Sequence, residues 1–291
     1  MLIGIDPKVD YAFKRLFGSQ ANLLLLINLL NAVLAFPPGR QIADLEIQNP
    51  FNEKEHWDDK LSIVDIKARD QDGRLFNVEM QMLATDYFLQ RILYYWAKLF
   101  EQQLHEGDDF NLLRPTYSIC FVNDILFSET ANHHLIFRLT DGEHKLTFAD
   151  ELVIHLVELP KFQLTADLLS TPLDLWCYFL RHAEAIDREQ VPKSLDVPPL
   201  RQALEVLTVL TQNDIEREKY EARLKKQRDE RSNLRGAEER GILVGQIQAY
   251  EKMLRRAPST FDQLKAMRME KLKEMAADLE KQVLPGNGSP S

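Results

Sequence analysis

The sequence predicts an α/β domain, in which helices flank a mixed β-sheet, followed by a helical C-terminal arm. Helical and strand-like patterns alternate along residues 10–182 in the order helix, strand, hairpin, helix, strand. Apolar residues make up 45% and charged residues 28% of the 291 residues, which is an ordinary globular composition. Residues 214–281 carry 17 basic and 14 acidic side chains, whereas the rest of the chain carries 19 basic and 31 acidic ones. The last residues are therefore expected to form charged helices attached to a globular body.

Two helices are expected before the first strand. The first covers residues 10–16 and stops before Gly18, and the second covers residues 22–36 and stops before Pro37. The second contains the longest apolar run, residues 23–36, which is 14 residues long. Because a bilayer span needs about 20 apolar residues, this run is expected to be a core helix, and no membrane partner is expected.

The remaining elements follow from short apolar runs between turn residues and from longer runs with helical spacing. Residues 70–73, Asp-Gln-Asp-Gly, separate two strand-like runs, and Gly107 follows a strongly apolar helical pattern. Strands are expected over residues 44–47, 61–69, 74–82, 117–122 and 152–159, and helices over residues 86–105, 172–182, 200–231 and 261–283.

Three prolines in residues 191–199 separate two helical patterns and mark the expected domain boundary. We expect a globular domain over residues 1–195, a helical arm over residues 196–284 and a disordered tail over residues 285–291.

The arm carries two features with structural consequences. Gly236, Gly241 and Gly245 predict a frayed or hinged segment, because glycine costs about 1 kcal/mol relative to alanine inside a helix. Apolar side chains at helical spacing from Leu264 to Leu279 form a stripe that needs burial. This stripe is expected to pack against the body or to join copies of the chain into a homo-oligomer.

Several function classes are disfavoured by composition. Two cysteines cannot build a disulfide framework, which indicates a reducing compartment such as the cytoplasm. No basic segment followed by an apolar one begins the chain, so no secretory signal is expected. No glycine-rich phosphate-binding pattern is present, so no nucleotide cofactor is expected. The net charge of −9 argues against coating nucleic acid by bulk charge, but it is compatible with an enzyme that meets phosphate through a metal ion.

The most informative segment is the hairpin on either side of residues 71–73. A three-residue loop with Gly73 in the left-handed region pairs residues whose numbers sum to 144, which places Asp65 opposite Glu79. Opposed side chains have Cβ atoms about 4.5–5.5 Å apart, and Gln81 lies two residues beyond Glu79 on the same face. Two carboxylates this close repel unless a cation neutralises them, and Mg²⁺ is commonly held by one or two carboxylates. The alternative is a surface hairpin with two solvated acids, but the apolar neighbours of both residues favour buried strands.

Four segments in this order carry a family resemblance. An aspartate, a turn and then Glu-x-Gln resemble the PD-(D/E)xK nuclease signature. More closely, residues 10–18 (DYAFKRLFG), 60–65 (KLSIVD), 73–81 (GRLFNVEMQ) and Tyr94-Tyr95 together resemble the PD-(D/E)xK family transposases, the recombination-promoting nucleases of bacteria. The resemblance covers roughly residues 5–190.

The resemblance implies a restriction-endonuclease-like core with the order αβββαβ and magnesium-dependent cleavage of DNA. It assigns Asp65 and Glu79 as the metal-binding acids and places Gln81 where many PD-(D/E)xK enzymes have lysine. Glutamine can orient a water or a phosphate, but it cannot supply a positive charge.

Six further residues are candidates for a supporting part. Asp10 and Lys14 share one helix face, as an exposed ion pair or as an addition to the site. Gln90 and Tyr94 have the Q-x-x-x-Y spacing of RecB-like nucleases, although tyrosine on an apolar helix more often belongs to a core rim. Two basic side chains complete the set: Arg91, which needs an anionic partner on so apolar a helix, and Lys67, which shares the strand face of Asp65.

Two functional hypotheses follow. The first is a Mg²⁺-dependent DNA endonuclease acting in recombination or on mobile elements, with Asp65, Glu79 and Gln81 as its catalytic residues. The second is a catalytically inactive module on the same fold that binds nucleic acid or protein. The presence of an acid at both metal positions favours the first hypothesis. The histidines have no metal-ligand spacing and are expected to be structural.

Overall fold

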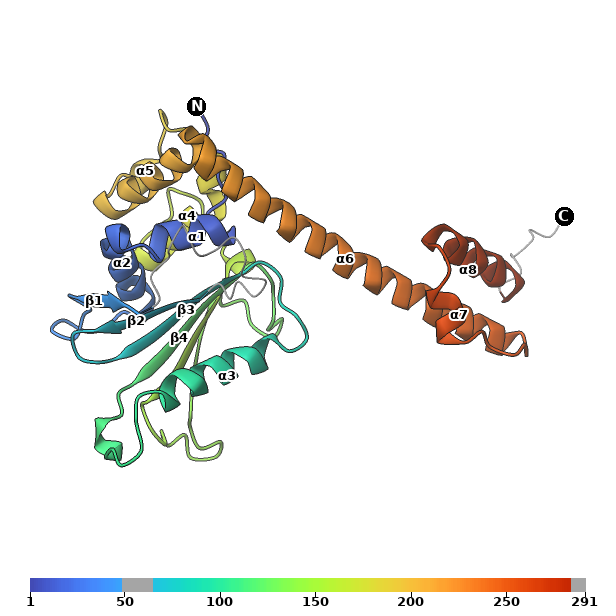
Figure 1. Ribbon diagram of the computed structural model, residues 1–291, viewed down its shortest axis with the longest axis horizontal. Coiled ribbons are helices and arrows are strands. Elements are labelled where there is room, and N and C mark those ends of the chain that lie inside the picture. The colour runs from blue at the N-terminus through green and yellow to red at the C-terminus, as the bar shows by residue number, and fades with distance from the viewer. Residues whose placement is uncertain (49–64, 284–291) are drawn as a thin grey trace. The chain divides into compact units, whose positions relative to one another are not determined.

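The computed structural model describes residues 1–48 and 65–283 (Figure 1). The chain forms two compact units, Met1–Leu224 and Lys225–Ser291. The first unit therefore extends past residue 195, where the sequence suggested a boundary.

The first unit contains a mixed six-stranded sheet with the strand order β1-β2-β3-β4-β6-β5. The first three strands pair antiparallel, β3, β4 and β6 run parallel, and β5 pairs antiparallel with β6 at the edge. The strands are β1 (Leu45–Ile47), β2 (Asp65–Asp70), β3 (Leu75–Gln81), β4 (Thr116–Val122), β5 (His134–Arg138) and β6 (Leu152–Glu158). This architecture confirms the predicted α/β class and its αβββαβ order, which β5 and β6 extend; of these two strands only β5 was not predicted.

Helices cover both faces of the sheet (Figure 1). α3 (Phe88–Glu101) lies on one face, where Phe88 and Ile92 pack with Cys120, Val122 and Leu156 of the sheet. The large core lies on the other face, where side chains such as Phe13, Leu26 and Trp176 meet the sheet. The helices of that face are α1 (Asp10–Phe17), α2 (Leu23–Leu34), α4 (Pro172–His182) and α5 (Pro198–Gln212).

The hairpin between β2 and β3 has the predicted turn and register. Gly73 adopts φ +78°, the left-handed region that glycine enters without a Cβ penalty. Asp70 N–H donates to Arg74 O at 3.1 Å, and a buried ion pair joins Asp70 Oδ2 and Arg74 Nε at 2.5 Å. The strands pair as predicted, with Asp65 opposite Glu79 and Lys67 opposite Asn77. Residues 61–64, the predicted start of β2, lie outside the described residues.

The expected helix over residues 200–231 is two helices. α5 ends at Gln212, and α6 (Asp214–Met253) begins after Asn213, whose Oδ1 accepts hydrogen bonds from the N–H groups of Ile215 and Glu216. α5 belongs to the core of the first unit, because it buries apolar side chains along one face, including Leu200, Leu207 and Leu210.

The second unit buries the apolar stripe within the chain itself. Leu264, on α7 (Phe261–Lys265), and Leu272 and Leu279, on α8 (Met269–Val283), pack with Val244 and Ile247 of α6. Arg240 Nη1 donates to Lys265 O at 3.1 Å and to Met267 O at 2.7 Å, which fixes the turn between α7 and α8. The stripe is thus buried by α6 residues of its own unit, a partner that the sequence did not indicate, and assembly into a homo-oligomer stays a prediction.

The glycines of the arm do not interrupt their helix. α6 runs through Gly236, Gly241 and Gly245 without a break, contrary to the expected hinge. Packing of Val244 and Ile247 against α7 and α8 stabilises the helix just where the last glycines weaken it.

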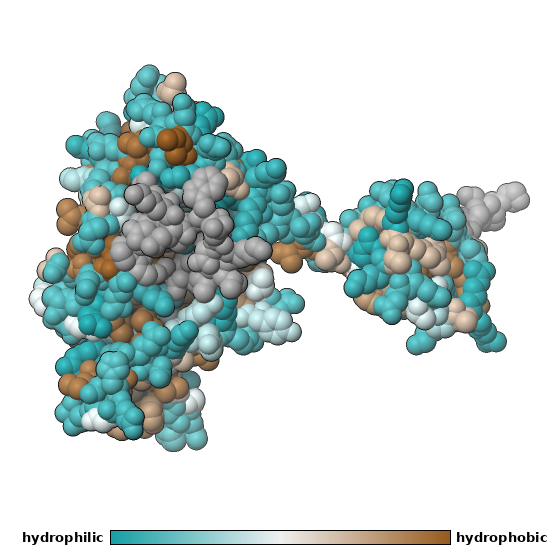
Figure 2. Space-filling view, in the orientation of Figure 1, coloured by the Kyte–Doolittle hydropathy of each residue, from teal (hydrophilic) through white to brown (hydrophobic). Residues whose placement is uncertain are grey.

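No single helix in residues 1–48 and 65–283 is long and apolar enough to cross a membrane; α1 joined to residues Gln20–Leu34 passes only as a bent pair. Its apolar side chains, including Leu16, Leu25 and Leu29, are buried in the core of the first unit. The surface visible in Figure 2 is mostly hydrophilic, with scattered apolar patches.

The unit boundary leads to a prediction about truncation. Glu216 and Tyr220 lie on α6 but belong to the first unit: Tyr220 OH accepts from Asp6 N–H at 2.9 Å, and Glu216 Oε2 accepts from Tyr11 OH at 2.9 Å. A chain ending at Leu224 is expected to unfold with a free energy within about 1 kcal/mol of the first unit in the full chain. A chain ending at Asn213 loses a buried aromatic ring and two hydrogen bonds, so its free energy of unfolding should fall by at least about 2 kcal/mol.

Urea denaturation followed by circular dichroism measures both chains. Equal stability of the two truncated chains would show that the first turns of α6 do not support the first unit.

Candidate functional site

The predicted acids occupy opposed positions on neighbouring strands. Asp65 begins β2 and pairs directly with Glu79 of β3. Residues opposed in this way face the same side of a sheet. The predicted strand register, with Asp65 opposite Glu79, is therefore confirmed. The side chain of Asp65 lies outside the described part of the structure.

Glu79 is buried, with 2% of its surface exposed. Its strand neighbour on the other side is Cys120 of β4, on the α3 face of the sheet. A buried carboxylate is costly unless a cation or hydrogen bonds compensate it. Arg91 of α3 supplies such a cation, because its Nη2 lies 2.5 Å from Glu79 Oε1. Burial, with the Glu79 charge adding to it, raises the pKa of the Cys120 thiol well above its ordinary value, so the thiol stays protonated at neutral pH.

Gln81 is held in one orientation by two hydrogen bonds. Its Nε2 donates to Leu83 O at 2.6 Å, and its Oε1 accepts from Arg91 Nη2 at 2.8 Å. One guanidinium nitrogen thus bridges an oxygen of Glu79 and an oxygen of Gln81. The predicted anionic partner of Arg91 is therefore Glu79, on the strand beneath its helix.

The loop after β4 lies beside the end of β3. Asn123 N–H donates to Gln81 O at 2.9 Å, and Ala84 N–H donates to Asp124 Oδ2 at 3.4 Å. Glu158, at the end of β6, holds the next residues of this loop, because its Oε1 accepts from Leu126 N–H at 2.5 Å and Phe127 N–H at 3.0 Å. The sequence showed Glu158 only as the end of a strand.

A row of polar residues crosses the sheet two residues along the strands from Asp65 and Glu79. Lys67, Asn77 and Ser118 are register partners on β2, β3 and β4, on the same side as Glu79. Asn77 and Ser118 are buried, and Asn77 Oδ1 and Ser118 Oγ have no hydrogen-bond partner among residues 1–48 and 65–283. Sequence reasoning missed Asn77 and Ser118, although the strand parity that links Asn77 to Glu79 was a signal for it.

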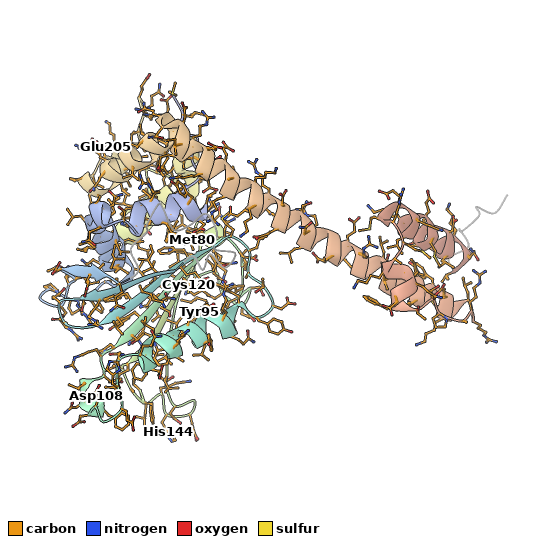
Figure 3. The ribbon with its side chains drawn as sticks, in the orientation of Figure 1. Met80, Tyr95, Asp108, Cys120, His144 and Glu205 are labelled. Carbon is orange, nitrogen blue, oxygen red and sulfur yellow. The ribbon has the colours of Figure 1, made fainter. Side chains whose placement is uncertain are left out.

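The other candidates on α3 face away from Glu79. Gln90 and Tyr94 are exposed, and the Tyr94 ring packs against Tyr95. Figure 3 labels Tyr95 on α3 and Cys120 on the sheet that α3 covers. Arg91, one position beyond Gln90, is the residue that reaches Glu79, so a part for Gln90 and Tyr94 stays a prediction.

The first-helix pair has the predicted spacing. Lys14 Nζ lies 3.5 Å from Asp10 Oδ1 in the predicted i,i+4 arrangement, and both side chains are largely buried. α1 covers the face of the sheet opposite α3 (Figure 1). A part of this pair in the site also stays a prediction.

The histidines of β5 and β6 have a structural place. His134 Nε2 and His155 Nδ1 lie 2.9 Å apart and join the edge strand to its neighbour. Burial disfavours the charged ring and lowers the pKa of His155 to about 3 and that of His134 to about 4. Both rings are therefore neutral at pH 7.

The residues present fit a hard divalent cation. In the described ranges, no three His, Cys, Asp or Glu side chains gather as a metal cluster. Mg²⁺ does not require such a cluster, since it keeps several waters and binds through one or two carboxylates. Oxygen atoms of Glu79 and Gln81 already bind one cationic group, the Arg91 guanidinium, and Asp65 is the register partner of Glu79.

The comparisons with known proteins agree with this arrangement. The family described as "PD-(D/E)XK nuclease family transposase" matches residues 7–237, which include the whole sheet and every candidate residue. Neither the comparison with curated proteins nor the comparison with solved structures gives a match. The α/β core, the paired positions of Asp65 and Glu79 and the family match lead to one conclusion: the chain belongs to the PD-(D/E)XK nuclease family transposases.

Proposed function

We propose that this protein is a Mg²⁺-dependent DNA endonuclease that acts on mobile elements or in recombination. The observation that carries the proposal is the register of β2 and β3, which sets Asp65 opposite the buried Glu79. The family membership adds the reaction class, cleavage of a phosphodiester bond. The two free, buried cysteines of the chain are compatible with action in the reducing cytoplasm.

Each residue has a distinct task in this proposal. Asp65 and Glu79 hold the cation, and Gln81 orients a water or a phosphate oxygen through its fixed amide. When bound, the cation activates water and neutralises charge that develops on the phosphate. The chain carries a net charge of −9, so contact with DNA depends on this local positive charge rather than on the surface as a whole.

A nicking assay tests the proposal. Supercoiled plasmid incubated with the full chain should be converted to nicked or linear DNA in the presence of Mg²⁺, and it should remain supercoiled in EDTA. DNA that stays intact with Mg²⁺, Mn²⁺ and a range of substrates would support the alternative, a catalytically inactive module that binds nucleic acid or protein on the same fold.

Gln81 allows a test of what its position requires. If the amide only orients water, Gln81→Lys should retain or raise Mg²⁺-dependent nicking, because lysine adds positive charge where negative charge develops. The rates of Gln81→Lys and wild-type chains on one plasmid give the comparison, with melting temperature as the check on folding. Complete loss of nicking in a folded variant would show that the amide itself is needed.

A further inference from the structure

Arg91 is placed where a cation bound by Glu79 would lie. Its Nη2 contacts Glu79 Oε1 at 2.5 Å and Gln81 Oε1 at 2.8 Å, and its guanidinium carbon lies 5.1 Å from the centre of the Phe88 ring. Gln81 turns its oxygen toward Arg91 because its nitrogen is committed to Leu83 O. One of these two oxygens belongs to Glu79, which the proposed function assigns to the cation, and the other belongs to Gln81, which it assigns to a water or a phosphate.

The surroundings of Arg91 let it leave this position. Its side chain is 34% exposed, whereas that of Glu79 is 3% exposed. Its Nε has no hydrogen-bond partner among the described residues, and the hydrogen bonds to Glu79 and Gln81 are both made by Nη2. A rigid structural ion pair normally uses the two-pronged geometry of arginine on a carboxylate, and that geometry is not used here.

Charge balance gives Arg91 a second partner. Asp65 and Glu79 with Arg91 carry a formal charge of −1, and a divalent cation changes this to +1. The bound cation cancels the charge of the two acids, so Arg91 loses the net negative charge that held it, and one phosphodiester returns the site to neutrality. Guanidinium groups bind phosphate oxygens well in bidentate geometry.

We propose that Arg91 is an exchangeable counter-ion: it neutralises Glu79 when no metal is bound, and on metal binding it moves to a phosphate of the DNA. The inference rests on the proposed function, because it takes the Asp65–Glu79 position as the metal site. It adds a coupling between metal and DNA, since the cation releases a DNA-binding group. Without metal, the site would bind DNA weakly, because Arg91 is then paired with Glu79.

Metal binding by the full chain tests the exchange without any cleavage. Isothermal titration with Mn²⁺ compares the wild type, Arg91→Met and the matched control Lys98→Met, which removes an exposed positive charge from the same helix. Without its competitor, Arg91→Met should bind Mn²⁺ about tenfold more tightly, the scale of ordinary coupling between two ligands. Lys98→Met should bind as the wild type does. Arg91→Lys keeps a charge, so its Mn²⁺ affinity should lie between those of the wild type and Arg91→Met. It is the second variant in case Arg91→Met folds poorly, and it should then still bind Mn²⁺ more tightly than the wild type.

DNA binding measures the second half of the exchange. With Ca²⁺, an oxygen-binding cation, in place of Mg²⁺, a fluorescent DNA duplex should bind Arg91→Met several-fold more weakly than Lys98→Met. Without metal, these two variants should bind the duplex equally.

The outcomes separate the two proposals. Suppose that folded Arg91→Met and Arg91→Lys bind Mn²⁺ as tightly as the wild type does, and that Asp65→Ala does not bind it. This result would overturn the exchange and still support the metal site. Absence of Mn²⁺ binding in the wild type and in both Arg91 variants would overturn both proposals.

Discussion

Replacing Glu79 with glutamine is expected to lower the rate of Mg²⁺-dependent DNA cleavage by more than about 100-fold. Loss of partners in the outer shell of a metal site already costs about 10–100-fold in affinity or activity, and Glu79 is assigned as a direct ligand. The substitution keeps the size of the side chain and an oxygen for Arg91 Nη2, which now lies 2.5 Å from Glu79 Oε1. The buried position should therefore keep its packing while it loses its charge.

The matched control for this change is Glu101→Gln. Glu101 is an exposed acid at the end of α3, so the variant has the same change in net charge away from the site. Single-turnover cleavage of a labelled duplex gives the rates, and thermal melting checks the fold. A folded Glu79→Gln chain that cleaves as fast as Glu101→Gln would remove Glu79 from the metal site.

Glu158→Ala is expected to lower the free energy of unfolding by about 3–5 kcal/mol, the cost of breaking a buried ion pair by removing one partner. Glu158 is fully buried, its Oε2 forms an ion pair with Lys161 Nζ, and its Oε1 accepts from two backbone N–H groups. Alanine would leave the largely buried Lys161 ammonium with Phe127 O at 2.5 Å, and no carboxylate partner among its contacts. The loop after β4, which adjoins Gln81, would lose its anchor.

Two variants give this measurement its controls. Glu158→Gln keeps an acceptor for the N–H groups of Leu126 and Phe127, so it should lose less stability than alanine. Glu129→Ala changes an exposed acid just beyond the same loop and should stay within about 0.5 kcal/mol of the wild type. Urea denaturation measures all three. A Glu158→Ala chain as stable as Glu129→Ala would mean that the buried pair does not hold the loop.

The parts of the site predicted from sequence are those governed by local rules. The turn at Gly73 and strand alternation determine which residues oppose each other, so the pairing of Asp65 with Glu79 was available from a segment of fifteen residues. Arg91 was recognised as needing an anion, because an arginine on an apolar helix must find one. Its partner could not be named, because the contact depends on how α3 lies on the sheet.

The parts that the sequence did not predict depend on contacts between distant segments. β5 has no clear alternation of buried and exposed residues, and its pairing with β6 makes it a strand. The sequence placed the residues of α5 at the start of a charged helical arm. In the structure, its leucines pack in the core with residues from the N-terminal part of the chain. The apolar stripe of α8 was seen, but its partner on α6 depends on the turn that follows Met253.

Anomalous diffraction from crystals of the full chain soaked in Mn²⁺ tests the metal site most directly. The predicted result is a manganese peak between β2 and β3, about 2–2.5 Å from carboxylate oxygens of both Asp65 and Glu79, with the Arg91 guanidinium moved away from Glu79. A manganese peak elsewhere in a chain that cleaves DNA, or Mn²⁺-dependent cleavage with no peak at Glu79, would contradict the assignment of these two acids.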